Sequence, residues 1–184
     1  MRIFVALILA SFSSLALAET PVNGAQTELE QLLTALPMAP NEAAAARLEA
    51  RISELWQRSA GPTAALLMGR AARHLQGNEA SQSVQDYDAV LALEPDFTDA
   101  FAKRAVARYQ SGNVTGAVAD LEQAVKQEPR QFNAWRALSD IAADQQHWPQ
   151  ALAAWKKLLE IDPQTADGAK HLKELIVKVE GEGA

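Results

Sequence analysis

A period of about 34 residues runs through the middle of this 184-residue chain and restricts its possible folds more than any other feature. Pro95, Pro129 and Pro163 lie at equal intervals, and each of them follows an acidic residue. At the same interval, large side chains mostly recur with large ones and small with small: Leu67, Phe101 and Trp135; Ala71, Ala105 and Ser139; Ser83, Ala117 and Ala151; Tyr87, Leu121 and Trp155; Val90, Ala124 and Leu158. This pattern predicts stacked units, because each unit fills the space that its neighbour leaves.

The period and the residue types resemble the tetratricopeptide repeat family, whose unit is a helix–turn–helix of about 34 residues. The resemblance covers about residues 62–165, and the second unit carries the family's residue types best: Phe101, Ala105, Gly112, Ala117, Leu121, Ala124 and Pro129. It implies an all-α fold, a right-handed α-solenoid of three units at residues 62–95, 96–129 and 130–163. In each unit a helix A precedes a helix B. The family also implies a role in binding proteins or peptides.

Residues 1–18 have the features of a secretory signal peptide. Arg2 supplies a positive start, Ile3 to Ala18 carries no charge, and Ala16-Leu17-Ala18 places small residues before the cleavage point. The alternative is an uncleaved membrane anchor, but the uncharged stretch is shorter than the ~20 residues that span a bilayer. We therefore expect cleavage after Ala18 and no stable membrane insertion afterwards. The mature protein would be periplasmic in a Gram-negative cell and secreted in any other.

Residues 19–61 are expected to form a linker, 19–26, followed by two helices. The first helix would begin at Thr27 and stop before Pro37, and the second would follow an N-cap at Asn41. We interpret the pair as a helical extension that shields the first repeat, with Trp56 in the core. After the third repeat, residues 164–180 are predicted to form a capping helix with a polar outer side, and residues 181–184 a frayed tail.

The turns inside the three units differ in sequence. Gly77 lies one residue before the position that corresponds to Gly112 in the first unit, so the sequence leaves the register of the first A helix undecided by one residue. The third turn has no glycine, and we expect Trp148 to order it, with Pro149 in the first turn of the B helix.

Two charged columns predict ion pairs between the A and B helices. Arg70 and Arg104 are each followed by an aspartate sixteen positions later, Asp86 and Asp120. In the third unit Leu138 and Ala154 occupy these columns, so both charges are absent together. We therefore predict Arg70–Asp86 and Arg104–Asp120 pairs with a structural role.

No arrangement of residues points to catalysis, a cofactor or a metal. The formal charge is −6 without a basic run, which disfavours nucleic acid as a partner, and the absence of cysteine excludes thiolate sites. The three histidines are far apart, and only His171 has a potential co-ligand at helical spacing, Glu174, which is too few for a metal site. We expect a protein without enzymatic activity.

The resemblance places a ligand on the concave face, which the A helices line. The expected peptide-binding residues are Met68, Leu75, Lys103, Val106, Tyr109, Gln110, Arg136 and Asp140. Apolar anchors lie in the first two units and polar groups in the third, although Arg136 and Asp140 can also pair with each other on one helix. The flanking helices can alternatively fill part of this face. Met68 and Ala72 stand where relatives that clamp a peptide C-terminus have Lys and Asn, so that clamp is absent.

Our interpretation is an exported adaptor or scaffold that binds a protein or peptide of the cell envelope through the concave face. One alternative is a chaperone-like assembly or maturation factor that holds exported clients. Another is a regulatory subunit of an envelope enzyme complex. The identity of the partner and the oligomeric state do not follow from the sequence.

Overall fold

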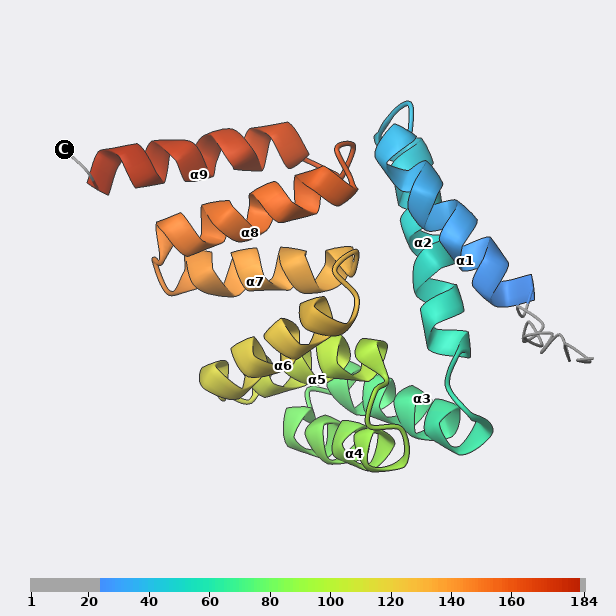
Figure 1. Cartoon of the computed structure of the whole chain (residues 1–184). Helices are drawn as coiled ribbons and strands as arrows, with labels where there is room; N and C mark the ends of the chain where they lie inside the picture. The colour runs from blue at the N-terminus through green and yellow to red at the C-terminus, as the bar shows by residue number, and fades with distance from the viewer. Residues whose placement is uncertain (1–23, 183–184) are drawn as a thin grey trace, which may run out of the picture.

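The computed structural model describes residues 24–182, which contain nine α-helices and one short 3₁₀-helix and no strand (Figure 1). The elements are α1 (Gly24–Ala35), η1 (Leu36–Met38), α2 (Glu42–Arg58), α3 (Pro62–Gln76), α4 (Ala80–Leu93), α5 (Thr98–Gln110), α6 (Val114–Gln127), α7 (Phe132–Asp144), α8 (Trp148–Ile161) and α9 (Gly168–Glu182). The signal peptide predicted at residues 1–18 lies outside the described residues. The prediction of an all-α repeat fold is confirmed.

Three helix hairpins, α3–α4, α5–α6 and α7–α8, correspond to the three predicted units. Their second helices, the B helices α4, α6 and α8, each have 14 residues and follow one another at the interval of the sequence period. The first helices, α3, α5 and α7, are the A helices, and α9 continues their series. Most columns identified from the sequence are buried: Ala71, Ala105 and Ser139; Ser83, Ala117 and Ala151; Tyr87, Leu121 and Trp155; Val90, Ala124 and Leu158. The repeating side chains therefore form the core between the hairpins.

A residue with a left-handed backbone ends the turn inside each hairpin. These residues are Asn78, Gly112 and Gln146, with φ of 60°, 85° and 60°, and they occupy the same position of successive repeats. Gly77 has an ordinary φ of −78°, so the first A helix keeps the common register and Asn78 takes the place of Gly112. Asparagine tolerates this conformation better than most residues. In the third turn the strained position falls on Gln146, and α8 begins at Trp148 with Pro149 in its first turn.

The N-terminal hairpin differs from the sequence prediction at its start. The first helix begins at Gly24 and not at Thr27, so residues 24–26 are helical and the predicted linker is too long. Pro37 falls in the 3₁₀ turn that follows. Asn41 caps α2 as predicted, because its side chain accepts a hydrogen bond from the backbone N–H of Ala44 at 2.9 Å.

The prediction that this hairpin shields the first repeat is wrong. Its apolar side packs on the third repeat, where the rings of Trp56 and Phe132 lie 5.2 Å apart. Figure 1 shows α2 crossing the ends of α7 and α8 instead of lying parallel to α3. The guanidinium of Arg130 also holds both carboxylate oxygens of Glu30, at 2.8 and 2.9 Å. Aromatic and ionic partners from distant parts of the sequence therefore decide where the hairpin docks.

The capping helix α9 packs beside α8, with Leu175 buried in the same core cluster as Trp155. It starts at Gly168, later than the predicted residue 164, because Thr165 is buried and belongs to the preceding turn. Residues 181 and 182 are helical, so the predicted tail from 181 to 184 is too long at its start.

Gln146 offers a direct test of the turn geometry. Replacing it by glycine removes the steric cost of the left-handed conformation, ~1–2 kcal/mol, against a smaller loss from glycine's extra freedom in the unfolded chain. We expect Gln146→Gly to raise the free energy of unfolding by about 0.5–1 kcal/mol in urea denaturation. Gln145→Gly, at a neighbouring φ of −85°, is the control and should lower it. Equal effects of the two changes would contradict this account.

Candidate functional site

The predicted binding face lies on the A helices, and its first-repeat part is less available than the sequence suggested. Met68 on α3 is 7% exposed and belongs to the core cluster that contains Ala71 and Tyr87, so it is not an exposed anchor. Leu75 packs half-buried against the same cluster. Met68 and Leu75 of α3 therefore contribute to the core and do not form an open apolar surface.

The third-repeat part of this face is covered by α2. Arg136, predicted to bind a ligand, donates hydrogen bonds to Glu49 at 2.5 Å and to Thr165 at 2.8 Å. Asn133 donates to Ser53 at 3.3 Å. Arg136 does not pair with Asp140, which is exposed on the same helix. Of the two possibilities left open by the sequence, the structure has the flanking helix filling this part of the face.

The remaining open surface is centred on α5. Val106 is 39% exposed, and Gln110 one turn later is also exposed. The ammonium group of Lys103 lies 3.8 Å from the carboxylate of Asp99, whose pKa burial raises to about 6. These residues present an apolar side chain between a cationic and an amide group.

Tyr109 ties the second repeat to the third at the edge of this surface. Its hydroxyl donates a hydrogen bond to Asp144 of α7 at 2.5 Å. This bond raises the pKa of Tyr109, because the phenolic proton is held by the carboxylate. The aromatic ring is half-buried, so Tyr109 both positions α7 and borders the open face.

A buried acidic group lies where α2 meets the turn between α8 and α9. Asp162 is fully buried, and one of its oxygens accepts a hydrogen bond from the backbone N–H of Gln164 at 3.1 Å. Burial, followed by the hydrogen bond and the charge of Glu49, raises the pKa of Asp162 to about 7, while Arg136 acts in the opposite direction. The contact between the hairpin and the third repeat therefore contains a carboxyl group that stays protonated at pH values where an ordinary aspartate is ionised.

Both predicted ion pairs are present between the A and B helices. Nε of Arg70 donates to Asp86 at 2.9 Å, and its Nη2 contacts the same carboxylate. Arg104 binds Asp120 in a two-pronged arrangement, with Nε–Oδ2 at 2.9 Å and Nη2–Oδ1 at 2.6 Å. The first pair is exposed to solvent at Arg70, whose side chain is 52% exposed. The second pair is largely buried, with side-chain exposures of 13% for Arg104 and 4% for Asp120.

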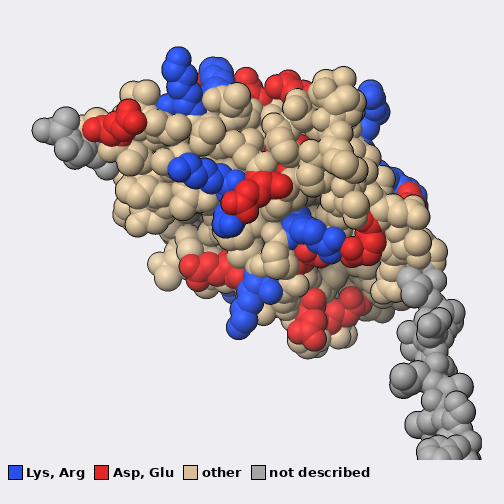
Figure 2. Space-filling model, turned by 45° about the horizontal axis from the view of Figure 1, so that its top comes forward, with Lys and Arg blue, Asp and Glu red and all other residues tan. Residues whose placement is uncertain are grey.

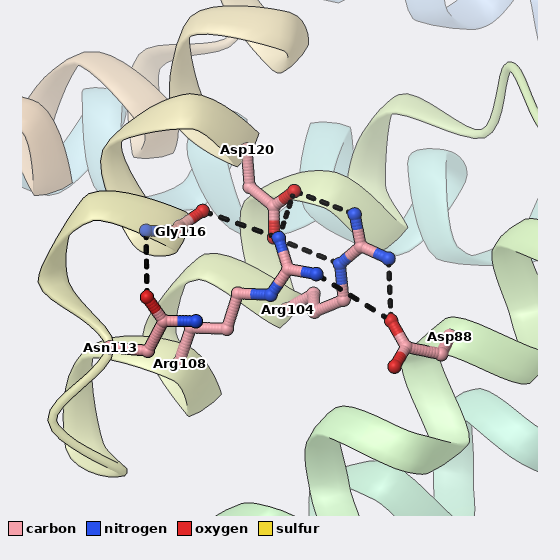
Figure 3. A network of polar contacts seen from close by, with 6 residues as sticks. All are labelled: Asp88, Arg104, Arg108, Asn113, Gly116 and Asp120. Carbon is pink, nitrogen blue, oxygen red and sulfur yellow. Dashed lines mark hydrogen bonds and ion pairs between the residues drawn. The ribbon is translucent and has the colours of Figure 1, made fainter.

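The second pair belongs to a larger network that the sequence reasoning missed (Figure 3). Arg104 also donates to Asp88 of α4 at 2.6 Å, and Arg108 lies 2.8 Å from Asp120. The network thus joins the first repeat to the second through α4, α5 and α6. The sequence does contain a periodic signal for this network. His74 stands one repeat before Arg108, and it lies 3.0 Å from Asp86 just as Arg108 lies close to Asp120.

Residues 24–182 contain neither a cluster of metal-ligating side chains nor a helix that could span a membrane. Within residues 24–182 no three His, Asp or Glu side chains gather closely enough to hold a metal ion. No helix in this range is both long enough and apolar enough to cross a bilayer. On the face drawn in Figure 2, basic and acidic side chains are interspersed, and neither sign covers a continuous area.

A family model of the tetratricopeptide repeat matches residues 102–166. The chain is similar to a TPR repeat-containing protein of Rhizobium etli, with 26% identity over 155 residues, which cover 83% of this chain and 75% of the relative.

Two solved structures share the fold. The Sgt2 TPR domain from Aspergillus fumigatus superposes with a TM-score of 0.62 at 24% identity, covering 67% of this chain and 83% of that domain. The TPR2B domain of yeast Sti1, in its pHsp70 complex, superposes with a TM-score of 0.58 at 15% identity, covering 66% of this chain and 99% of that domain.

We predict that the buried and exposed members of the network differ strongly in their effect on stability. Asp120→Ala leaves Arg104 without its main partner in a largely buried position, which should lower the free energy of unfolding by about 3–5 kcal/mol. Asp88→Ala removes a carboxylate that is 50% exposed and should cost less than ~1 kcal/mol. Chemical denaturation of both variants checks this, and similar losses would contradict it.

We also predict that Asp162 makes stability depend on pH. Its folded-state pKa of about 7 lies above the ordinary value of 3.8, so between these values the folded protein binds a proton more tightly than the unfolded chain. The contribution of Asp162 is therefore fully present below about pH 4 and is lost as the pH rises to about 7.

Thermal unfolding measured from pH 4 to 8 should show this slope in the wild type and a flatter profile in Asp162→Asn. Asp167→Asn, an exposed residue of the same turn, is the control. If Asp162→Asn unfolds with the same dependence on pH as the wild type, another group is responsible for that dependence.

Proposed function

The repeats of this chain are tetratricopeptide repeats, and on that premise we propose that the protein is an exported adaptor that binds a protein or peptide of the cell envelope. The proposed contact surface is the A-helix face of the second repeat, bordered by the docked N-terminal hairpin. It includes Lys103, Val106 and Gln110 on α5, with Tyr109 at its edge. The protein performs no chemistry in this proposal.

The observation that carries the proposal is the uneven covering of the A-helix face. Helix α2 occupies the part on α7 through Glu49 and Arg136, whereas α5 keeps Val106 at 39% exposure beside polar groups. An apolar side chain with a polar surround is the usual composition of a small protein contact. The yeast Sti1 domain in its pHsp70 complex supports a peptide as the kind of ligand. Its ligand is not carried over, because Met68 and Ala72 replace the clamp residues.

Export is proposed from residues 1–18 alone. Their positive start, uncharged stretch and small residues at the end favour recognition by the secretion machinery and cleavage after Ala18. The adaptor would then act in the periplasm of a Gram-negative cell or outside any other cell.

Site-specific photocrosslinking tests the binding surface. A photoreactive residue in place of Val106 should capture a partner in the envelope fraction, because this side chain lies in the open part of the face. The control is the same residue in place of Lys156, which is exposed on the B helix α8. Val106→Glu should reduce recovery of that partner in a pull-down about tenfold. Equal capture from both positions would refute the concave-face proposal.

The pattern of capture also separates the alternatives. One saturable partner supports an adaptor, many unrelated exported proteins support a chaperone-like factor, and co-purification with one enzyme supports a regulatory subunit. Any catalytic turnover by the purified chain would contradict the non-enzymatic role.

We further expect the mature protein to begin at Glu19. N-terminal sequencing of protein recovered from the periplasm or the medium measures this directly. Replacing Ala16 and Ala18 by bulky residues should block cleavage and leave the larger form on the membrane. Recovery of the intact chain from the cytoplasm would contradict export.

A further inference from the structure

A cleft of about 940 Å³ lies between the second and third repeats, on the side of the array that carries the B helices. Helices α6 and α8 form its walls and α7 its floor. The lining is mainly apolar and includes Val118 and Val125 of α6, Leu138 and Ala142 of α7, and Ala154 of α8. The cleft does not involve the face of α5 discussed above.

The equivalent junction between the first and second repeats is filled with charged side chains. There Asp88 of α4, Arg104 and Arg108 of α5 and Asp120 of α6 form the network of Figure 3. These four side chains link α4, α5 and α6, which correspond to α6, α7 and α8 one repeat later.

Moving one repeat along the chain replaces three of the four members by apolar side chains. Arg104, Arg108 and Asp120 become Leu138, Ala142 and Ala154, all of which line the cleft. Two alanines fill far less space than an arginine and an aspartate, so the junction is left partly empty. The cleft is therefore the volume that the ionic network occupies in the preceding junction.

The fourth member keeps its charge. Asp88 becomes Glu122, which also lines the cleft and is exposed. Within the described part of the chain the side chain of Glu122 makes no hydrogen bond or ion pair, whereas Asp88 is held by Arg104 and lies 3.7 Å from Arg108. The second junction thus retains the acceptor of the network and has lost both of its cations.

We propose that this cleft binds a segment of another protein that supplies the missing groups. Apolar side chains of the segment cover Leu138, Ala142 and Ala154, and an arginine or lysine beside them pairs with Glu122. The arrangement reproduces, between two chains, the contact that Arg104 and Arg108 make with Asp88 inside this one. Lys157 also lines the cleft, but its ammonium group is held by Glu160 at 2.8 Å, so the unpaired charge of Glu122 selects a basic segment among apolar ones.

The shape of the cleft favours a helix or an extended segment. Residues from Val114 to Val125 line one wall and residues from His147 to Lys157 the other, so the cleft follows both helices for about three turns. Thr115, Gln145 and Gln150 stand among the lining residues and can bind polar groups at the edges of the segment.

Two synthetic helical peptides test the proposal in titrations with the mature protein. Both carry leucines along one face, and they differ at one position beside that face, which is arginine in one and glutamate in the other. The arginine peptide should bind the wild type about five- to tenfold more tightly than the glutamate peptide. Glu122→Lys should reverse this preference, and Asp96→Lys, at an exposed site in the turn before α5, should leave it unchanged.

A second variant fills the cleft. Ala142→Arg together with Ala154→Asp copies the Arg108–Asp120 pair into the third repeat and should abolish binding of both peptides while the melting transition remains cooperative. If the peptides bind equally well to the wild type, or if Glu122→Lys leaves their order unchanged, the proposal is wrong. Glu122 is exposed, so this test does not depend on whether the double variant folds. Crosslinking from Val106 is independent of both outcomes.

Discussion

Small side chains let neighbouring helices of the array approach closely, and this close packing sets the geometry of every hairpin. Ala71, Ala105 and Ser139 are fully buried in successive A helices, and each lets its B helix come near enough to bury a large partner. Because these small residues recur once in every repeat, each hairpin meets the next with the same geometry. The helix lengths, the turn positions and the direction of the stack all follow from this repetition.

Polar columns vary within that fixed geometry, and their variation gives the junctions different properties. The first junction is held by a four-member ionic network, and the second keeps one carboxylate beside an apolar cleft. Replacing a buried ionic group by apolar residues does not by itself destabilise a fold, provided that all partners are replaced together. In the third repeat Leu138, Ala142 and Ala154 change together, which leaves no cation or anion stranded in the core. A repeat array can thus acquire a new surface without losing its stacking.

The N-terminal hairpin covers part of the A-helix face and so reduces the surface that is open to a ligand. Its ion pair between Glu49 and Arg136 and its contact between Trp56 and Phe132 cover the polar part that the sequence had assigned to a ligand. What remains open is the short surface around Val106 on α5. Asp162, whose pKa is raised mainly by burial, lies at the same contact, and a buried carboxyl group is costly once it ionises.

Local and periodic features of this protein follow directly from its amino-acid sequence. The period of the repeat determined the helix hairpins and the buried columns, and the spacing of sixteen between Arg104 and Asp120 determined their pairing across one hairpin. These contacts join residues whose relative positions are set by a single repeating unit, so their separation along the chain is enough to predict them. The left-handed position at Asn78 was missed only because glycine next to it gave a stronger signal.

The docking position of the hairpin, the part of the A-helix face that it covers and the open cleft depend on tertiary contacts. Arg130 meets Glu30 from a distant part of the sequence, and no periodicity relates the two, because the hairpin lies outside the repeat. The cleft depends on the volume that three helices leave between them, and single columns of the sequence do not give that volume. Both features arise from contacts between separate units, whose geometry exists only once the chain has folded.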